Sequence, residues 1–203
     1  MDLEVEFGGI DIYLFDQLHR GRIRAGDRVF DAGCGGGRNL VYLMRAGFEV
    51  FGADADSDAV AHVQRLARDL APALPATNFR TEPLDRLTFP EAFATVVISS
   101  AVLHFARTDA EFDAMLDGSW RVLAPRGLFF CRLASSIGLE SAVTPLAPGS
   151  RRHALPDGTE RYLVDEDFLV ERTRRLGGQL LDPLKTTVVQ GQRSMTTWVV
   201  RKS

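Results

Sequence analysis

The sequence predicts an α/β protein in which a mostly parallel sheet lies between two layers of helices. Along most of the chain, short apolar runs alternate with segments of helical periodicity, which is typical of βαβ units. The chain has 203 residues, 45% of them hydrophobic, which is enough for one domain with a substantial core and too few for two ordinary ones. We therefore expect residues 1–203 to form a single domain.

Seven strands are expected, and the glycine-rich run after the first of them is the most informative feature. The most apolar strand, at 94–99, contains Val96-Val97-Ile98 and suits a central position that is covered on both faces. A Gly-containing turn at 191–193 separates the last two strands, which are expected to form an antiparallel hairpin at one end of the sheet. The expected strands are 28–32, 48–53, 77–82, 94–99, 128–133, 184–190 and 195–201.

Helical periodicity indicates the connections between these strands. The clearest helix, Ser57 to Leu70, follows Asp56 as a candidate N-cap and has an apolar residue at every third or fourth position. Gly47 and Gly177 stand where left-handed C-terminal caps belong. The other expected helices are 12–18, 38–46, 109–123 and 165–176.

Regular patterning lapses between the fifth strand and the last helix. Residues 134–164 are rich in Ser, Pro, Gly and Arg. A loop of that length inside a compact domain is usually either functional or disordered. We expect this irregular segment to cover a substrate site.

Composition argues against several classes of function. The net charge is −3 and the 24 Lys and Arg residues are dispersed, which disfavours nucleic acid as a partner. No apolar run is long enough to cross a membrane and the first residues are acidic, so a cytoplasmic protein is expected. The two cysteines form no CxxC pair, and neither a His at zinc-ligand spacing nor an Asp/Glu cluster for magnesium is evident, so no metal site is expected.

The chemistry-bearing feature is the run Asp31-Ala32-Gly33-Cys34-Gly35-Gly36-Gly37. Its glycines let a ligand approach the backbone at the carboxyl edge of the sheet, where α/β folds place their ligands. A dinucleotide fingerprint on this spacing would need a glycine at the position of Arg38. The Asp31 carboxylate disfavours a pyrophosphate but suits a ligand that carries ammonium and sulfonium charges. Asp54 ends the next strand, at the interval where an acidic residue reaches a ribose hydroxyl. These features favour S-adenosylmethionine.

The same residues resemble the class I S-adenosylmethionine-dependent methyltransferases, in which an aspartate-glycine-x-glycine-x-glycine loop is followed by an acidic strand end. The resemblance extends over residues 11–133 and includes the segments 50–54, 98–104 and 121–127. It implies a Rossmann-like three-layer sandwich with a seven-stranded sheet, and methyl transfer to a small-molecule acceptor. The Gly37-Arg38-Asn39 extension also resembles the tellurite-resistance methyltransferases, a family that acts on small anions or other soft nucleophiles.

The resemblance implies a role for each part of the cofactor site. Asp31 and the glycine loop would hold the methionine end, Asp54 the ribose and Glu82 the adenine amino group, while Ser99-Ser100 would face the methionyl portion. Because Pro83 follows Glu82, the backbone N–H often donated to adenine cannot exist here. The cofactor-binding candidates are Asp31, Gly33, Cys34, Gly35, Gly37, Asn39, Asp54, Ala55, Glu82, Pro83, Ser99 and Ser100.

Methyl transfer from a sulfonium needs mainly positioning and exclusion of water. If the acceptor is a hydroxyl or a protonated amine, His104 after the fourth strand is the first candidate for a base and His153 the second. If it is a soft anion, arginines suffice. Core packing and solvated surface charge are the competing interpretations of these side chains. The substrate-binding candidates are Tyr13, Arg38, Arg151, Arg152 and Arg161.

Three alternatives from other classes stay open at this point. An NAD-dependent oxidoreductase would share the fold, although Asp31 and Arg38 fit its loop poorly. A non-catalytic S-adenosylmethionine-binding regulatory module would carry the same cofactor motif, since cofactor and acceptor sites are separate. A protein methyltransferase is the third, although no docking domain is evident. The sequence identifies neither the accepting atom nor the oligomeric state.

Overall fold

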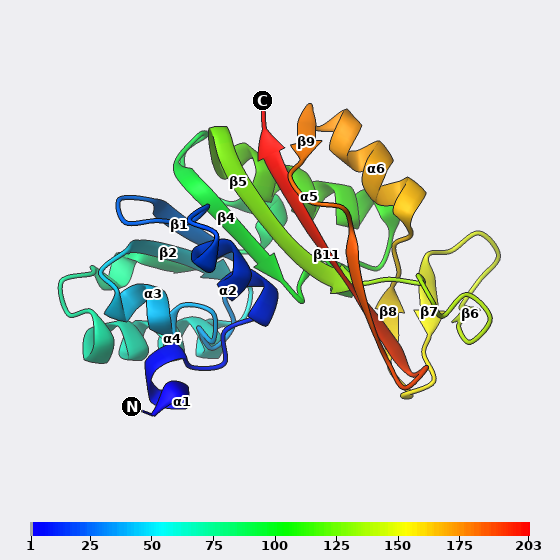
Figure 1. The fold of residues 1–203 in the computed structure, drawn as a ribbon, viewed down its shortest axis with the longest axis horizontal. Coiled ribbons are helices and arrows are strands. Elements are labelled where there is room, and N and C mark those ends of the chain that lie inside the picture. Colours follow the sequence, from blue (N-terminus) through cyan, green and yellow to red (C-terminus); the bar gives the residue numbers. More distant parts are fainter. Residues whose placement is uncertain (1) are drawn as a thin grey trace.

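A computed structural model of the protein describes residues 2–203 and contains one large sheet of eight strands (Figure 1). These strands are β1 (Arg28–Ala32), β2 (Glu49–Asp54), β3 (Phe79–Thr81), β4 (Ala94–Ser100), β5 (Leu123–Ala134), β9 (Gly178–Leu180), β10 (Lys185–Val189) and β11 (Arg193–Lys202). The order is β10-β11-β5-β4-β1-β2-β3, and β9 also pairs with β11. Strands β1 to β5 pair in parallel, whereas β11 is antiparallel to β5, β9 and β10. The mostly parallel sheet and the C-terminal hairpin are confirmed, with one strand more than expected.

Helices cover both faces of this sheet, which makes the three-layer, Rossmann-like arrangement. They are α1 (Leu3–Phe7), α2 (Ile12–His19), α3 (Val41–Arg45), α4 (Ser57–Leu70), α5 (Asp109–Val122) and α6 (Glu166–Arg175). Successive residues of β5 belong to different cores, because side chains along a strand alternate between its faces. Phe130 packs in the core with α2, α3 and α4, and Phe129 packs in the core with α5 and α6. No helix within residues 2–203 is both long and apolar enough to span a membrane.

Several element boundaries differ from the expected ones. The helix expected at 38–46 begins only at Val41, because the chain first turns after the glycines, with the Leu40 N–H donating to the Gly37 carbonyl at 2.8 Å. The strand expected at 77–82 is reduced to β3, because Ala76–Asn78 form a 3-10 helix, η1. Further 3-10 turns are η2 (Leu84–Arg86) and η3 (Leu103–Phe105). The strand expected at 128–133 extends to both sides as β5.

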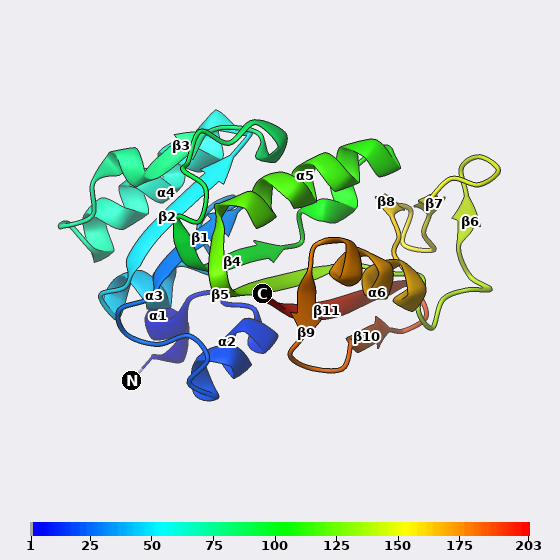
Figure 2. The same cartoon turned by 90° about the horizontal axis from the view of Figure 1, so that it is seen from above.

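Residues 135–164, the projecting segment, are built differently from the irregular loop that was expected. They contain a small antiparallel sheet of β6 (Thr144–Pro145), β7 (Arg152–Ala154) and β8 (Glu160–Tyr162). The base of the segment is closed, since the Val164 N–H donates to the Ala134 carbonyl at 3.3 Å. Leu155 and Leu163 form a small separate core with Ala134, and Met195 of β11 packs against it. The segment lies at the end of the molecule opposite β3 (Figure 2).

Candidate functional site

The glycine loop is held between the ends of β1 and β2. The N–H groups of Gly33 and Cys34 both donate to the Ala53 carbonyl, at 2.8 and 3.0 Å. The Gly35 N–H donates to Oδ2 of Asp54 at 2.8 Å, and the Asp56 N–H donates to its Oδ1 at 3.0 Å. Two backbone donors thus fix the Asp54 carboxylate beside the loop.

Two adjoining cavities open at this loop. One, of about 370 Å³, lies over the glycines, and the other, of about 610 Å³, extends from β2 toward η2 and α5. Gly33, Asp54, Val102 and Phe105 line both cavities, so together they form one cleft. Of the cofactor candidates, the first cavity is lined by Gly33, Cys34, Gly35, Asn39, Asp54 and Ser100, and the second by Gly33, Asp54, Ala55 and Pro83.

Asp31 lies beneath the loop and is not among the residues that line the cleft. Its side chain is buried, and Oδ1 has no hydrogen-bond partner within residues 2–203. Burial raises the pKa of this carboxyl group to about 8; Arg38 opposes the shift and Asp54 adds to it. The site therefore holds a buried acid that lacks a cationic partner in direct contact.

Gly37, Glu82 and Ser99 are also outside the walls of the cleft. A side chain at Gly37 would meet Val63 of α4, so this glycine provides close packing beneath the loop. The Glu82 carboxylate accepts hydrogen bonds from the N–H and the hydroxyl of Thr88. Ser99 is fully buried and its neighbour Ser100 lines the cleft, as the alternation along β4 requires.

Arg38, expected on the acceptor side, lines the cavity over the glycines. Its guanidinium donates to the Gly9 carbonyl at 3.1 Å and to the Ser100 hydroxyl at 2.9 Å. The Asp11 carboxylate lies 4.0 Å away, and the Arg38 side chain stays 47% exposed. Asn39 fixes the same corner, because its Oδ1 accepts the Asp11 N–H at 3.0 Å. A cationic group therefore faces the end of the cleft over the glycines.

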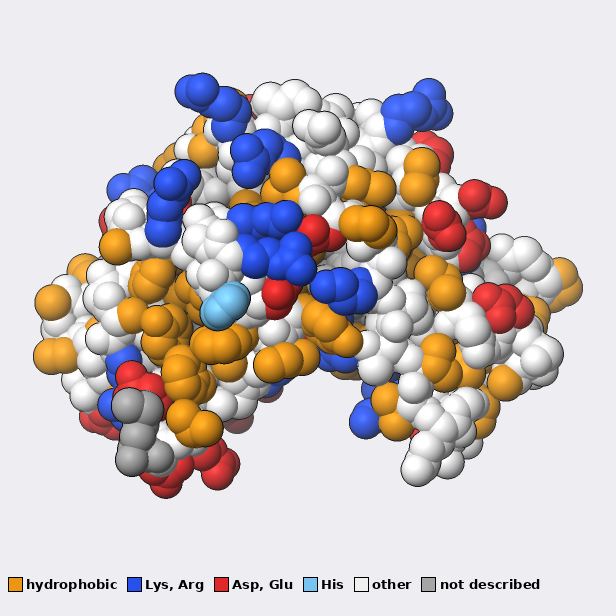
Figure 3. Space-filling model, in the orientation of Figure 1, with side chains coloured by type: hydrophobic (Ala, Val, Ile, Leu, Met, Phe, Trp, Pro, Cys, Tyr) orange, Lys and Arg blue, Asp and Glu red, His pale blue; other side chains and the backbone are white. Residues whose placement is uncertain are grey.

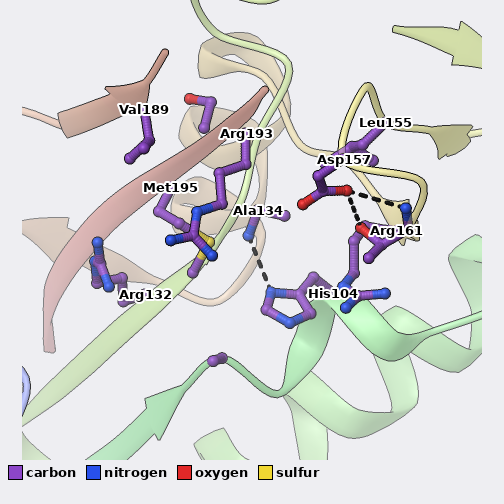
Figure 4. A pocket seen from close by; sticks show the side chains of 12 residues that line it. His104, Arg132, Ala134, Leu155, Asp157, Arg161, Val189, Arg193 and Met195 are labelled. Atoms are coloured by element: carbon purple, nitrogen blue, oxygen red, sulfur yellow. Dashed lines mark hydrogen bonds between the residues drawn. The ribbon is translucent and has the colours of Figure 1, made fainter. Parts of the chain in front are cut away.

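A third cavity, of about 290 Å³, lies next to the cleft, and Ala101 lines both. Its walls come from the segment after β4, from β5, from the projecting segment and from the β10–β11 hairpin (Figure 4). Figure 3 shows the molecule notched between the part formed by α1–α4 and the part formed by the hairpin and the projecting segment. The lining residues are Ala101, His104, Arg132, Ala134, Leu155, Asp157, Thr159, Arg161, Val189, Arg193, Ser194 and Met195.

His104 is buried at the floor of this third cavity. Its Nδ1 accepts the backbone N–H of Ala134 at 3.1 Å. Burial and the nearby charge of Arg161 lower the pKa of the imidazole to about 4, so the ring is neutral at pH 7. Because Nδ1 accepts, the single proton of the neutral ring is on Nε2. This arrangement favours His104 as a hydrogen-bond donor and disfavours the role of base that the sequence suggested.

The other predicted acceptor-side residues separate into two groups. Arg161 lines the third cavity, whereas Arg151, Arg152 and His153 do not. Arg151 pairs with Asp165 at 2.8 Å and lies over the Phe168 ring, so it fastens the projecting segment to α6. Tyr13 donates or accepts a 2.7 Å hydrogen bond with Thr187, which joins α2 to β10. Arg152 pairs with Glu160 across β7 and β8, and His153 Nδ1 contacts the Arg151 carbonyl.

Three charged residues of the third cavity were missed by sequence reasoning. Arg132 is a charged residue inside the otherwise apolar run 128–133 of β5, and that interruption was a usable signal. Arg193 and Asp157 lie at a hairpin turn and in a loop, where no local pattern distinguishes them from surface charge. Within residues 2–203, no group of three or more His, Cys, Asp or Glu is placed to hold a metal ion.

Comparison with known proteins gives a consistent result. A family model described as methyltransferase domain matches residues 30–131, which is half of the chain. The chain is 32% identical over 107 residues to an uncharacterized methyltransferase of Synechocystis sp., covering 53% of this chain and 47% of that one. It is 31% identical over 153 residues to a probable S-adenosylmethionine-dependent methyltransferase of Mycolicibacterium smegmatis, covering 73% and 54%. This chain thus spans about half the length of both curated relatives.

A solved structure with the same fold is the 1,6-didemethyltoxoflavin-N1-methyltransferase of Burkholderia thailandensis, crystallised with 1,6-didemethyltoxoflavin and S-adenosylhomocysteine. The TM-score is 0.72 at 21% identity, covering 100% of this chain and 81% of that one. The fold, the acidic glycine loop and the family match agree with one another. The chain belongs to the class I S-adenosylmethionine-dependent methyltransferases.

Proposed function

We propose that this protein transfers a methyl group from S-adenosylmethionine to a small-molecule acceptor. The observation that carries the proposal is the continuity of the site at Ala101. The cleft over the glycine loop and the third cavity meet at this residue, so a cofactor in the first would face an acceptor in the second. A site with two such compartments suits group transfer better than simple cofactor storage.

The residues of the cleft fit the chemical groups of S-adenosylmethionine. Arg38 suits the methionine carboxylate, and the buried Asp31 beneath the loop, whose carboxyl group would release its proton on binding, suits the ammonium group. Asp54 suits the ribose, and the larger cavity, with Pro83, Leu84 and Met115 among its walls, suits the adenine. When bound, S-adenosylmethionine supplies an electrophilic methyl group and leaves as a neutral thioether.

The same geometry argues against a dinucleotide. A pyrophosphate would need free backbone N–H groups at the start of a helix. Here the Gly35 N–H is bonded to the Asp54 carboxylate, and α3 begins only at Val41. A phosphate over this loop would also meet the negative charge of Asp54.

Binding measurements separate these possibilities. By isothermal titration, S-adenosylhomocysteine is expected to bind the protein and NAD is not. Asp54→Asn should weaken S-adenosylhomocysteine about 10- to 100-fold, because a hydrogen bond to a charged group contributes about 1.5–3 kcal/mol. The matched control is Asp58→Asn, which removes the same charge from the exposed first turn of α4 and should change affinity less than about twofold. Equal affinity in wild type and Asp54→Asn would contradict the site.

His104 gives a separate prediction on catalysis. Because the pKa of His104 is about 4, the wild-type kcat should show no ionisation near pH 6.5, the ordinary value for histidine. His104→Gln can still donate a hydrogen bond and should retain most activity, whereas His104→Ala should lose about tenfold or more. His104→Ala also leaves the Ala134 N–H without its partner and should be about 1–3 kcal/mol less stable. If the wild-type kcat instead rose with pH through an apparent pKa of 6–7, and both variants lost activity equally, His104 would act as a base.

A further inference from the structure

Three arginines line the third cavity. Arg132, Arg161 and Arg193 line a volume of about 290 Å³, against the single carboxylate of Asp157. They come from three separate parts of the chain, namely β5, β8 and the start of β11. Figure 4 shows Arg161 and Arg193 on opposite sides of the space beside His104. Arg132 is paired with Asp11, whereas Arg161 and Arg193 make no ion pair with any residue in the described range 2–203.

The hydrogen-bonding capacity of these arginines is only partly used. Arg132 pairs with Asp11 through Nη1 at 3.2 Å, yet its buried Nε has no partner within residues 2–203. Arg161 donates one Nη1 bond, to the Glu160 carbonyl at 2.7 Å, and its guanidinium lies 5.0 Å from the centre of the Phe105 ring. Arg193 makes no ion pair with any described residue. Each guanidinium has five N–H donors, so donors remain for a ligand.

Asp157 does not neutralise this cluster. Its carboxylate accepts the N–H and the hydroxyl of Thr159, at 3.0 and 2.6 Å, and so closes its own turn. Those hydrogen bonds, and more weakly the charges of Arg161 and Arg193, lower the pKa of Asp157. His104 is neutral at pH 7 and adds no charge. The cavity therefore keeps an excess of positive charge.

We propose that the methyl acceptor is a small organic anion, a carboxylate or a phosphate monoester, whose charged group is bound by Arg161 and Arg193. Guanidinium groups match the geometry of both anions and bind them through paired hydrogen bonds. The apolar side chains of Leu155, Val189 and Met195 line the same cavity and accommodate the organic part. The volume lies at the small end of ligand sites, which limits the acceptor to a compact molecule. This inference rests on the proposed function.

The test uses isothermal titration of the full chain with benzoate, phenyl phosphate and the neutral benzamide, each in the presence of saturating S-adenosylhomocysteine. At least one of the two anions should bind about tenfold or more tightly than benzamide, and its affinity should fall as salt is raised. Benzoate and phenyl phosphate distinguish a carboxylate acceptor from a phosphate acceptor. Arg193→Gln should weaken the preferred anion about tenfold or more.

Arg201→Gln is the matched control, since it removes the same charge from the exposed far end of β11 and should change anion affinity less than about twofold. Equal binding of the anions and benzamide, or no binding of either anion to protein that binds S-adenosylhomocysteine, would overturn the inference and leave the proposed function intact. An Arg193→Gln variant that is folded and binds the anion like wild type would overturn it as well. Failure of S-adenosylhomocysteine to bind would instead refute the proposed function.

Discussion

Replacing Asp31 by Asn is expected to make the protein more stable and to weaken S-adenosylhomocysteine about 100-fold. The carboxyl is buried without a partner for Oδ1, so its ionised form is disfavoured in the folded protein. A cationic ligand group above the loop would stabilise that ionised form, and the amide cannot replace its charge. The same side chain therefore opposes folding and favours binding.

The stability part of this prediction depends on pH in a defined direction. The pKa of Asp31 is about 8 in the folded protein, against 3.8 for an exposed carboxyl group. The folded state holds the proton of Asp31 more tightly than the unfolded state does. The contribution of Asp31 to the free energy of unfolding of the wild type is therefore greatest below pH 3.8, and it is lost as the pH rises through 8. Each pKa unit corresponds to about 1.36 kcal/mol, so at pH 7 Asp31→Asn should be on the order of 2–4 kcal/mol more stable. Urea unfolding at pH 5 and pH 7 measures the difference, which should shrink at pH 5.

The binding part has its own pH signature. Asp31 must release its proton when a cationic ligand binds, so the affinity of wild type should rise between pH 6 and 8, by up to about tenfold per pH unit. Isothermal titration in buffers of different ionisation enthalpy reports the released proton directly. The dependence of affinity on pH should disappear in Asp31→Asn. A wild-type affinity that does not change with pH would show that Asp31 does not change its ionisation when the ligand binds.

The fold was largely predictable because its strands are local patterns. β1 begins and ends where expected, and α4 spans the predicted residues, since its cap and apolar face are both encoded within one segment. β9 has only three residues and no apolar alternation, so its pairing with β11 depends on the surrounding fold. The small sheet of residues 135–164 was not predictable for the same reason, because its strands are two or three residues long.

The two halves of the site differ in how far sequence reasoning could reach. The cofactor half depends on one contiguous loop and on Asp54 at the end of the neighbouring strand, so spacing alone places them together. The proposed acceptor half is the third cavity, and its arginines Arg132, Arg161 and Arg193 are distant in sequence. Arg151 and Arg161 looked alike in the sequence, yet one pairs with Asp165 and the other faces the cavity. Only the three-dimensional arrangement separates a structural arginine from one available to a ligand.

The second prediction with a large effect concerns two glycines of the loop, which the structure assigns to different tasks. Both have positive φ, +49° at Gly35 and +80° at Gly37, so alanine costs about 1–2 kcal/mol of backbone strain at either position. A Cβ at Gly35 would meet no atom within 4 Å, because it would project into the open space of the cleft. A Cβ at Gly37 would lie 2.7 Å from Cγ2 of Val63 and 3.1 Å from Cδ2 of Leu66, inside the packing against α4.

Gly35→Ala should therefore lose only about 1–2 kcal/mol of stability but weaken S-adenosylhomocysteine about 100-fold, since the added methyl group occupies space that the ligand needs. Gly37→Ala should lose a further 1–3 kcal/mol from overpacking, about 2–5 kcal/mol in all, while its folded fraction binds within about tenfold of wild type. Urea unfolding and isothermal titration on both variants separate the two effects, each variant serving as the control for the other. Gly35→Ala should therefore be the more stable of the two variants, and Gly37→Ala should be the one that binds S-adenosylhomocysteine more tightly. If Gly35→Ala bound like wild type while Gly37→Ala lost binding without losing stability, the ligand would lie over Gly37, and the cleft described here would not be its site.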